Sequence, residues 1–157
     1  MSVRMPYRSA DIIDAVLQTC HVEPVDVMGK SRHPRVVAFR AIATLLMRKH
    51  TAMSYPEIAR DIYRPNHSTV ITAHYRLLYQ IEHPDAHGAR VELTDGNSYA
   101  VIDLIDSAER LLAQLHTKRR RREAALSTQT SQPPASPQTT VPSVSSERPM
   151  PLPYLGE

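Results

Sequence analysis

The sequence predicts an all-α protein: a small helical bundle with a helix-turn-helix, followed by a disordered C-terminal tail. Apolar residues make up 41% of the 157 residues and recur at helical spacing in several segments. Aromatic residues make up only 5%, with no Trp and one Phe, which leaves little to fill a β-sandwich. The four Gly residues are too few for a fold that depends on hairpin turns or glycine-rich phosphate loops.

The first two helices follow from apolar periodicity. Ser9 is the expected N-cap of a helix from Ala10 to Cys20, and a short connector then runs from Val22 to Gly29. The second helix is expected from about Pro34 to His50. Its apolar positions leave several basic side chains for its other faces: Arg35, Arg40, Arg48 and Lys49.

The next two helices form the predicted helix-turn-helix. Ser54 and Glu57 make a capping box, and Pro56 is tolerated in a first turn, so a short helix should begin here and end near Asp61. The chain then turns, and Asn66 is the expected N-cap of a fourth helix that runs to about Glu82.

The remaining chain divides by composition. Residues 83–96 read as an exposed connector, briefly extended between Ala89 and Leu93, and a long helix with an apolar stripe is expected to start at Asn97 or Ser98. From Leu126 onward seven of the thirteen prolines occur among Ser, Thr and Gln, which predicts disorder. The expected division is an arm (1–8), the helix-turn-helix domain (9–82), the connector (83–96), the long helix with a basic end (97–125) and the tail (126–157).

Charge is distributed unevenly along the chain. Residues 1–82 contain eleven Lys/Arg and seven Asp/Glu, whereas residues 83–116 contain two and six. A basic first part fits a polyanionic partner, although such an excess is also common on solvated surfaces. Lys118 to Arg122 are five consecutive basic residues, which suit either phosphate contact or a solvated helix end that complements the helix dipole.

Several classes of protein are disfavoured. Cys20 is the only cysteine, so an intramolecular disulfide is excluded, and its place at an apolar helix end predicts a core thiol. With no apolar run of about 18 residues, we expect no membrane partner and a cytoplasmic, nucleoid-associated protein. His83 and His87 have Pro84 between them and no completing ligands, so we expect no metal and no cofactor. Hydrolase motifs are absent, so we expect no catalytic residues and no enzyme activity.

The first turn of the fourth helix holds the candidate recognition residues. In a helix-turn-helix the second helix lies in the major groove, and its N-terminal residues contact bases. Asn66, His67 and Thr69 can donate or accept at base edges, and Ser68 suits a phosphate oxygen. The alternative is that Asn66 only caps, that Ser68 and Thr69 only favour a helix start, and that His67 is an ordinary surface residue. The residues alone leave both interpretations open.

Residues from about Asp11 to Leu77 resemble the C-terminal DNA-binding domain of the bacterial replication initiator DnaA. There is no gap between Arg32 and Ala73. The matching blocks are Ile12-Ile-Asp-Ala-Val16, Val27-Met-Gly-Lys-Ser-Arg32, Arg40-Ala-Ile-Ala43, Ser54-Tyr-Pro-Glu-Ile-Ala59 and Asn66-His-Ser-Thr-Val70. The resemblance implies a small helical bundle related to the Trp-repressor fold and a double-stranded DNA partner, with box-like A·T-rich sites.

The resemblance also implies roles for single residues. Arg32 falls where the family inserts an arginine into an A·T-rich minor groove, whose negative potential attracts a guanidinium. His67, Ser68 and Thr69 fall on the family signature that reads bases or holds phosphates in the major groove. The positions that contact backbone or bases are occupied by Arg40, Arg48, Tyr55 and Pro56.

Three positions depart from the family pattern. Asn66 stands where the family usually has Asp, and Pro65 where it has a basic residue. Tyr55 replaces a customary aliphatic residue beside Pro56. Because Asp accepts from cytosine and Asn pairs with adenine, we expect the preferred DNA sequence to differ from the usual box.

The family's initiators have an ATPase module ahead of this domain, whereas this sequence contains no Gly-x-x-x-x-Gly-Lys-Ser/Thr phosphate loop. We therefore expect it to bind a DNA site without ATP and to regulate replication initiation or transcription by occupying that site. The alternative is an interaction or adaptor protein that binds a replication protein through its last helix or tail.

Overall fold

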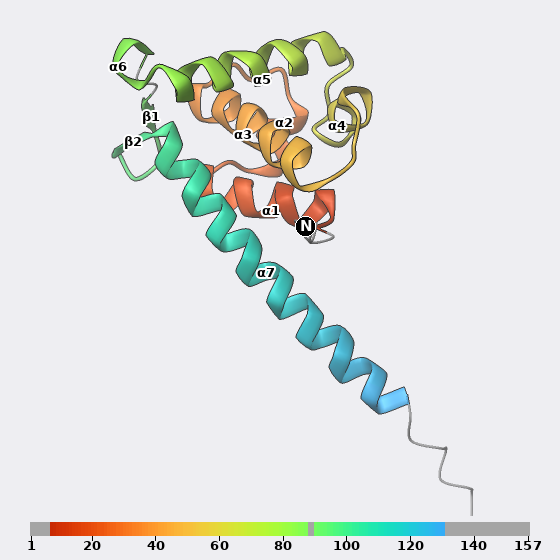
Figure 1. Cartoon of the computed structure of the whole chain (residues 1–157). Helices are drawn as coiled ribbons and strands as arrows, with labels where there is room; N and C mark the ends of the chain where they lie inside the picture. The colour runs from red at the N-terminus through yellow and green to blue at the C-terminus, as the bar shows by residue number, and fades with distance from the viewer. Residues whose placement is uncertain (1–6, 88–89, 131–157) are drawn as a thin grey trace, which may run out of the picture.

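The computed structural model describes residues 7–87 and 90–130, and it confirms an all-α fold with one small hairpin (Figure 1). The elements in chain order are α1 (Ser9–Cys20), α2 (Pro24–Met28), α3 (Pro34–His50), α4 (Tyr55–Asp61), α5 (His67–Glu82), α6 (Pro84–His87), β1 (Arg90–Glu92), β2 (Ser98–Ala100) and α7 (Val101–Thr130). No helix in the described ranges is long and apolar enough to cross a lipid bilayer.

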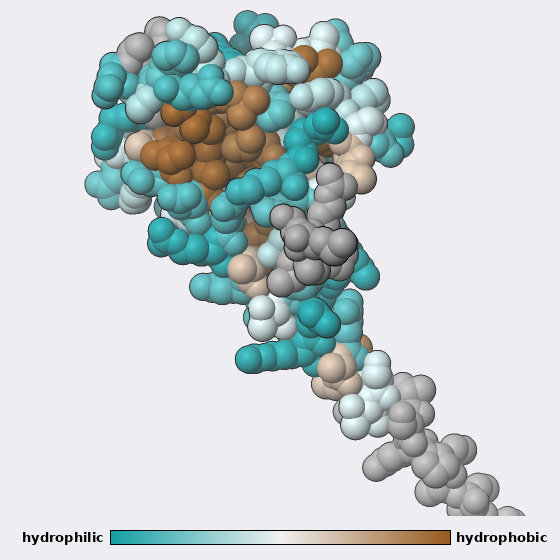
Figure 2. All heavy atoms as spheres, in the orientation of Figure 1, coloured by the Kyte–Doolittle hydropathy of each residue, from teal (hydrophilic) through white to brown (hydrophobic). Residues whose placement is uncertain are grey.

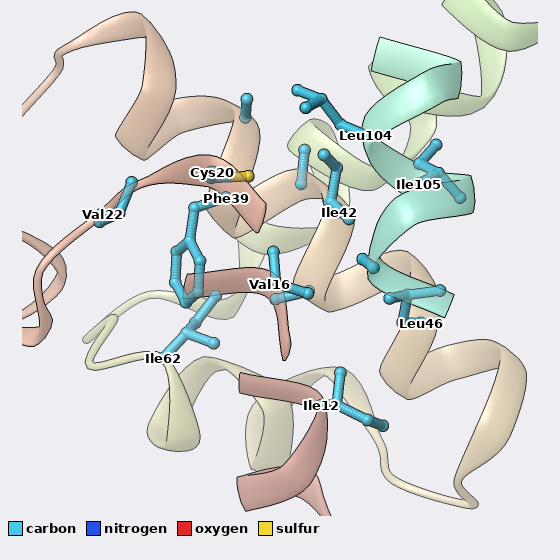
Figure 3. Packing of buried hydrophobic residues seen from close by; sticks show 14 of the residues in the cluster. Ile12, Val16, Cys20, Val22, Phe39, Ile42, Leu46, Ile62, Leu104 and Ile105 are labelled. Carbon is cyan, nitrogen blue, oxygen red and sulfur yellow. The ribbon is translucent and has the colours of Figure 1, made fainter. Parts of the chain in front are cut away.

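Helix α3 is the centre of the bundle. It packs against α1 and α7 on one side and against α5 on the other (Figure 1). Phe39, Ile42 and Leu46 of α3 are fully buried, and Figure 3 shows them in one cluster with residues of α1, α7 and the turn after α4. Because α5 and α7 both pack against α3, they share one hydrophobic core.

Two helices end in the same way. His21 after α1 and Tyr63 after α4 have left-handed backbones, with φ of 50° and 57°. The Tyr63 N–H donates to the Arg60 carbonyl at 3.1 Å, and the Arg64 N–H donates to the Ala59 carbonyl at 2.7 Å. This is the Schellman pattern, which satisfies the last carbonyls of a helix and turns the chain sharply.

The predicted connector from Val22 to Gly29 was wrong in part. Its middle is helix α2, which starts at Pro24 in the first helical position. Proline is favoured there because its missing N–H has no acceptor within the helix. The helix buries Val27 and ends at Gly29, so the chain enters the following loop from a fixed point.

The expected start of the last helix at Asn97 or Ser98 was also wrong. Ser98–Ala100 forms β2, which pairs antiparallel with β1 in the register Val91 opposite Tyr99. Gly96 has φ 76° in the turn between them, a conformation that Gly adopts without strain. The expected extended segment is observed as Arg90–Glu92, while Ala89 lies outside the described residues.

Helix α7 begins at Val101, and its apolar stripe is buried against the bundle. Val101, Leu104, Ala108 and Leu112 are at most 8% exposed. The helix continues to Thr130, past its expected end at residue 125, and the rest of the predicted disordered tail lies outside the described residues. Its distal part leaves the bundle as a single projecting rod (Figure 1).

Polar contacts fix the point where α7 leaves the bundle. Arg119 forms an ion pair with Asp11 of α1, and Arg8 lies 3.8 Å from Glu123. The Tyr7 ring makes edge-on contacts with His50 of α3 and with His116 of α7. Residues 1–6 of the predicted arm lie outside the described residues.

Candidate nucleic-acid interface

The first turn of α5 presents three of the candidate residues to solvent. His67, Ser68 and Thr69 are exposed, while Val70 and Leu77 on the opposite face are buried in the core. The four N–H groups at a helix start have no acceptor within the helix. The surface of this turn therefore combines small polar side chains with backbone donors.

Asn66 has a defined structural role in this turn. Its Oδ1 accepts from the Ser68 N–H at 3.0 Å and from the Ser68 hydroxyl at 2.8 Å. The expected N-cap role of Asn66 is therefore confirmed. Because Oδ1 is engaged, the amide NH₂ of Asn66 is the group left to meet a partner, and the hydroxyl oxygen of Ser68 is left as an acceptor.

The start of α4 is fixed by its own cap. The Ser54 N–H and hydroxyl both donate to Glu57 Oε2, at 2.7 and 2.6 Å, and these hydrogen bonds lower the pKa of Glu57. Pro56 is exposed in the first turn of α4. The cap therefore presents Pro56 on the surface at a fixed point.

Arg32 lies exposed in the loop between α2 and α3, and that loop is held by two other arginines. Arg40 of α3 donates to the carbonyls of Ser31 at 2.7 Å, Gly29 at 3.2 Å and Val27 at 3.4 Å. Arg64, from the turn before α5, donates to the same Gly29 carbonyl at 3.1 Å. The guanidinium of Arg40 is thus directed into the loop, where it holds the backbone at Ser31, the residue before Arg32.

The Arg32 loop and the start of α5 enclose one groove of about 540 Å³. Arg32 and Thr69 both line this groove, together with Arg64 and Pro65 of the turn before α5. Residues from two distant parts of the sequence are therefore brought to a single concave surface.

Three basic side chains near this groove and on α5 are exposed and have no ion-pair partner within residues 7–87 and 90–130: Lys30, Arg32 and Arg76.

Arg48, Tyr55 and His74 form a second cluster, which joins α3, α4 and α5. The Arg48 guanidinium lies 4.8 Å from the centre of the Tyr55 ring and donates to the Met53 carbonyl at 2.8 Å. The Tyr55 hydroxyl lies 2.8 Å from His74 Nδ1. Burial, together with the charge of Arg48, lowers the pKa of His74 and favours its neutral form.

The structure therefore separates the nine candidate residues into two kinds. Exposed positions are Arg32, Arg48, Pro56, Asn66, His67, Ser68 and Thr69. Arg40 and Tyr55 are partly buried; Nη1 and Nη2 of Arg40 donate to backbone carbonyls, and the Tyr55 hydroxyl contacts His74. Arg64 was not predicted from the sequence, because the Schellman turn that directs it toward Gly29 cannot be recognised from residue spacing.

Cys20 is fully buried at the end of α1, and burial raises the pKa of its thiol to about 12. A thiol with such a pKa has almost no nucleophilic thiolate at neutral pH. The prediction of a core thiol is confirmed.

Comparison with known proteins shows which family this domain is similar to. Residues 9–76 match the family described as the bacterial dnaA protein helix-turn-helix. The chain is 36% identical over 67 residues to the chromosomal replication initiator protein DnaA of Lacticaseibacillus casei (strain BL23). It is also 36% identical over 66 residues to the protein of that name from Lactiplantibacillus plantarum.

The similarity is confined to the helix-turn-helix part. The alignments cover 43% and 42% of this chain, and only 15% and 14% of the two relatives. The matched residues run from the first turn of α1 to the middle of α5 and contain both the Arg32 loop and the exposed first turn of α5. Residues 9–76 are a helix-turn-helix domain of the bacterial DnaA protein family.

Proposed function

We propose that this domain binds double-stranded DNA at a specific sequence, with the first turn of α5 in the major groove and Arg32 in the adjacent minor groove. The observation that supports this most is the shared groove. Arg40 and Arg64 hold the Arg32 loop beside Thr69 at the start of α5. A side chain that is fixed beside a recognition helix can reach the groove next to the one that the helix occupies.

The chemistry of α5 suits base edges in the major groove. His67 and Thr69 are exposed side chains that can form hydrogen bonds, and the Thr69 methyl group can meet a thymine methyl. The first-turn N–H groups that Asn66 does not cap suit phosphate oxygens, as helix starts do in general, whereas the Ser68 hydroxyl donates to Asn66 and is left to accept from a base donor. These contacts would fix the helix in the groove and read a few bases.

The state of Asn66 refines the expected specificity. Pairing with adenine requires both the oxygen and the NH₂ of the amide, but Oδ1 already caps α5. Asn66 would therefore contact DNA as a donor alone. It would donate a hydrogen bond to an acceptor on a base or a phosphate, and it would not specify adenine through a pair of hydrogen bonds.

Occupation of a DNA site is the role that we propose for the chain. The relatives are named as chromosomal replication initiators, and this chain spans about 15% of their length. By holding a box-like A·T-rich site, the domain would regulate replication initiation or transcription. Neither role requires a catalytic group.

The adaptor alternative depended on the apolar stripe of the last helix. Leu104, Ile105 and Leu112 of that stripe are buried against the bundle, so they form part of the core of this domain. A partner could bind them only after α7 had left the bundle. DNA binding needs no such rearrangement.

The experiment that tests the proposal is site selection from a random duplex library, followed by mobility-shift titration. The whole chain is titrated against the selected duplex and against a scrambled duplex of the same composition. We expect tighter binding of the selected duplex by at least tenfold. Equal affinity for the two duplexes would rule out specific recognition.

A further inference from the structure

The distal part of α7 differs in charge from the part that packs on the bundle. From Val101 to Thr117 the helix has three acidic residues and one basic residue, a net charge of −2. From Lys118 to Thr130 it has five basic residues and one acidic residue, Glu123, a net charge of +4. With a rise of 1.5 Å per residue, this basic part is about 18 Å long.

The five consecutive basic residues do not have the same environment. Arg119 is directed toward the bundle, where it pairs with Asp11 and lies 3.2 Å from Glu123. Lys118, Arg120, Arg121 and Arg122 are exposed and have no ion-pair partner among the described residues. Bundle stability therefore explains one of the five charges and leaves four without a structural role.

Three of these cations share one face of the helix. Lys118, Arg121 and Arg122 line a shallow surface with Gln114 and Thr117, bordered by small alanine side chains. Small neighbours allow a phosphate backbone to come close to the charged groups. The face, which we call the α7 basic face, consists of Lys118, Arg121 and Arg122.

Two simpler explanations fit these residues less well. Complementing the helix dipole requires charge in the last turn, whereas the basic residues lie about two turns before Thr130. Binding to a membrane surface requires a broad apolar face beside the charges, and Leu126 is the only large apolar residue between Lys118 and Thr130. Figure 2 shows the projecting part of the helix covered mainly by hydrophilic residues.

The position of this face separates it from α5. Helix α5 packs on one side of α3, whereas α7 crosses α1 on the other side and then projects away from the bundle (Figure 1). A straight duplex in contact with the first turn of α5 would lie across the bundle from the α7 basic face. The two surfaces are therefore placed for two separate segments of nucleic acid.

We propose that the α7 basic face binds the phosphate backbone of a second duplex segment without sequence preference, so that one molecule bridges two segments. The bridging part rests on the proposed function of α5, whereas phosphate binding by α7 does not. Each phosphate that is neutralised on B-DNA contributes about 0.9 to the slope of log K against log salt.

The test uses the whole chain with Lys118→Gln, Arg121→Gln and Arg122→Gln combined, because Gln keeps helix propensity and removes charge. Affinity for a duplex without a selected site is measured between 50 and 200 mM salt, and we expect the slope to fall by about 2 to 3 in magnitude. Arg110→Gln is the matched control, since it removes an exposed charge from the packed part of the same helix. That control should leave the slope unchanged.

Bridging is measured by capture. The selected duplex is fixed to beads, the protein is bound, and a labelled duplex without the site is added. Wild type should retain the labelled duplex, and the triple variant should bind the beads but lose at least four-fifths of the capture. Combining Arg32→Ala with His67→Ala should abolish bead binding through the selected site and keep the salt slope of wild type, so failure of α5 recognition is distinguished from failure of the α7 basic face.

Three outcomes would overturn the proposal. An unchanged salt slope in the triple variant would show that the α7 basic face does not bind phosphates. A reduced slope without capture by wild type would show that both surfaces share one duplex. Loss of binding to anionic phosphatidylglycerol vesicles in the triple variant, with DNA binding intact, would assign the face to a membrane surface.

Discussion

The first turn of α5 and the distal part of α7 are both exposed and polar, but they are built by different means. At α5 the exposed side chains belong to a capped first turn, where Asn66 engages Ser68, and Arg64 connects the preceding turn to the Arg32 loop. On α7 the exposed groups are long, flexible cations on a rod that leaves the bundle. Fixed polar groups suit base recognition, whereas mobile cations suit phosphates in any sequence.

The contrast extends to the arginines. Arg40 and Arg64 donate hydrogen bonds to backbone carbonyls of the loop that contains Arg32. These bonds hold that loop beside α5. Of the arginines on α7, only Arg119 has a partner on another helix within the described part of the chain, and that partner is the Asp11 carboxylate. The basic residues near α5 therefore differ: Arg40 and Arg64 are engaged within the protein, whereas Arg32 is exposed. A charge count alone overstates how many of them are free to meet a partner.

The largest expected effect tests whether α7 and the bundle that includes α5 unfold as one unit. Leu112 of α7 is 1% exposed, and Leu112→Ala should lower the free energy of unfolding by about 2–5 kcal/mol because it leaves a cavity. Leu126→Ala, in the projecting part where the side chain is 64% exposed, should change it by less than about 0.5 kcal/mol. Urea denaturation followed by circular dichroism measures both. Two separate transitions in wild type would show that α7 is not part of the same cooperative unit.

The second effect sharpens the difference between base reading and phosphate contact. Arg32→Ala should weaken binding by about 1–3 kcal/mol, mainly at sites with an A·T-rich half. Lys30→Ala, in the same loop, should weaken all duplexes to a similar extent if Lys30 contacts the phosphate backbone. Mobility-shift titration of selected sites with and without the A·T-rich half compares the two variants. A uniform loss for Arg32→Ala would reassign that residue to the phosphate backbone.

The third effect separates capping from recognition at α5. Asn66→Ala should cost about 1 kcal/mol of stability because it removes the acceptor of the Ser68 N–H. Asn66→Asp keeps that acceptor and replaces the outward NH₂ by an oxygen, so stability should be retained while base preference changes. Thermal unfolding and repeated site selection provide the two readouts. Identical selected sequences for wild type and Asn66→Asp would remove Asn66 from the recognition residues.

The smallest effect concerns pH. The pKa of His74 is lowered in the fold, so the unfolded chain binds this proton more readily, and the stabilising contribution present above about pH 6.5 is lost as pH falls from there toward the folded pKa. The unfolding free energy should therefore decrease from pH 7.5 to pH 5.5, and less so in His74→Gln. Urea titrations at the two pH values measure the difference. Equal pH dependence in both proteins would contradict the assignment.

The sequence predicted the helices whose ends carry local signals. Ser54 with Glu57 marks the start of α4, and Asn66 marks the start of α5, because side chains within four residues decide each cap. Helix α2 and strand β2 were missed because they are only five and three residues long, too short for a periodic pattern. Asn97 and Ser98 also have the composition of a helix cap, although the turn at Gly96 places them in a hairpin.

The candidate site was predictable to a smaller extent. Its exposed first turn of α5 follows from the cap at Asn66 and the apolar spacing of Val70 and Leu77. The inward direction of Arg40 does not, since its partners are loop carbonyls nine to thirteen residues earlier. Such contacts depend on tertiary structure, as does the groove that joins Arg32 to Thr69.

The most direct test of the two-groove account is methylation interference on the selected duplex. Dimethyl sulfate methylates guanine N7 in the major groove and adenine N3 in the minor groove. We expect interference at guanines in one segment and at adenines in the adjacent A·T-rich segment, with the adenine signal lost in Arg32→Ala. Interference confined to one groove, or an adenine signal that persists in Arg32→Ala, would contradict the account.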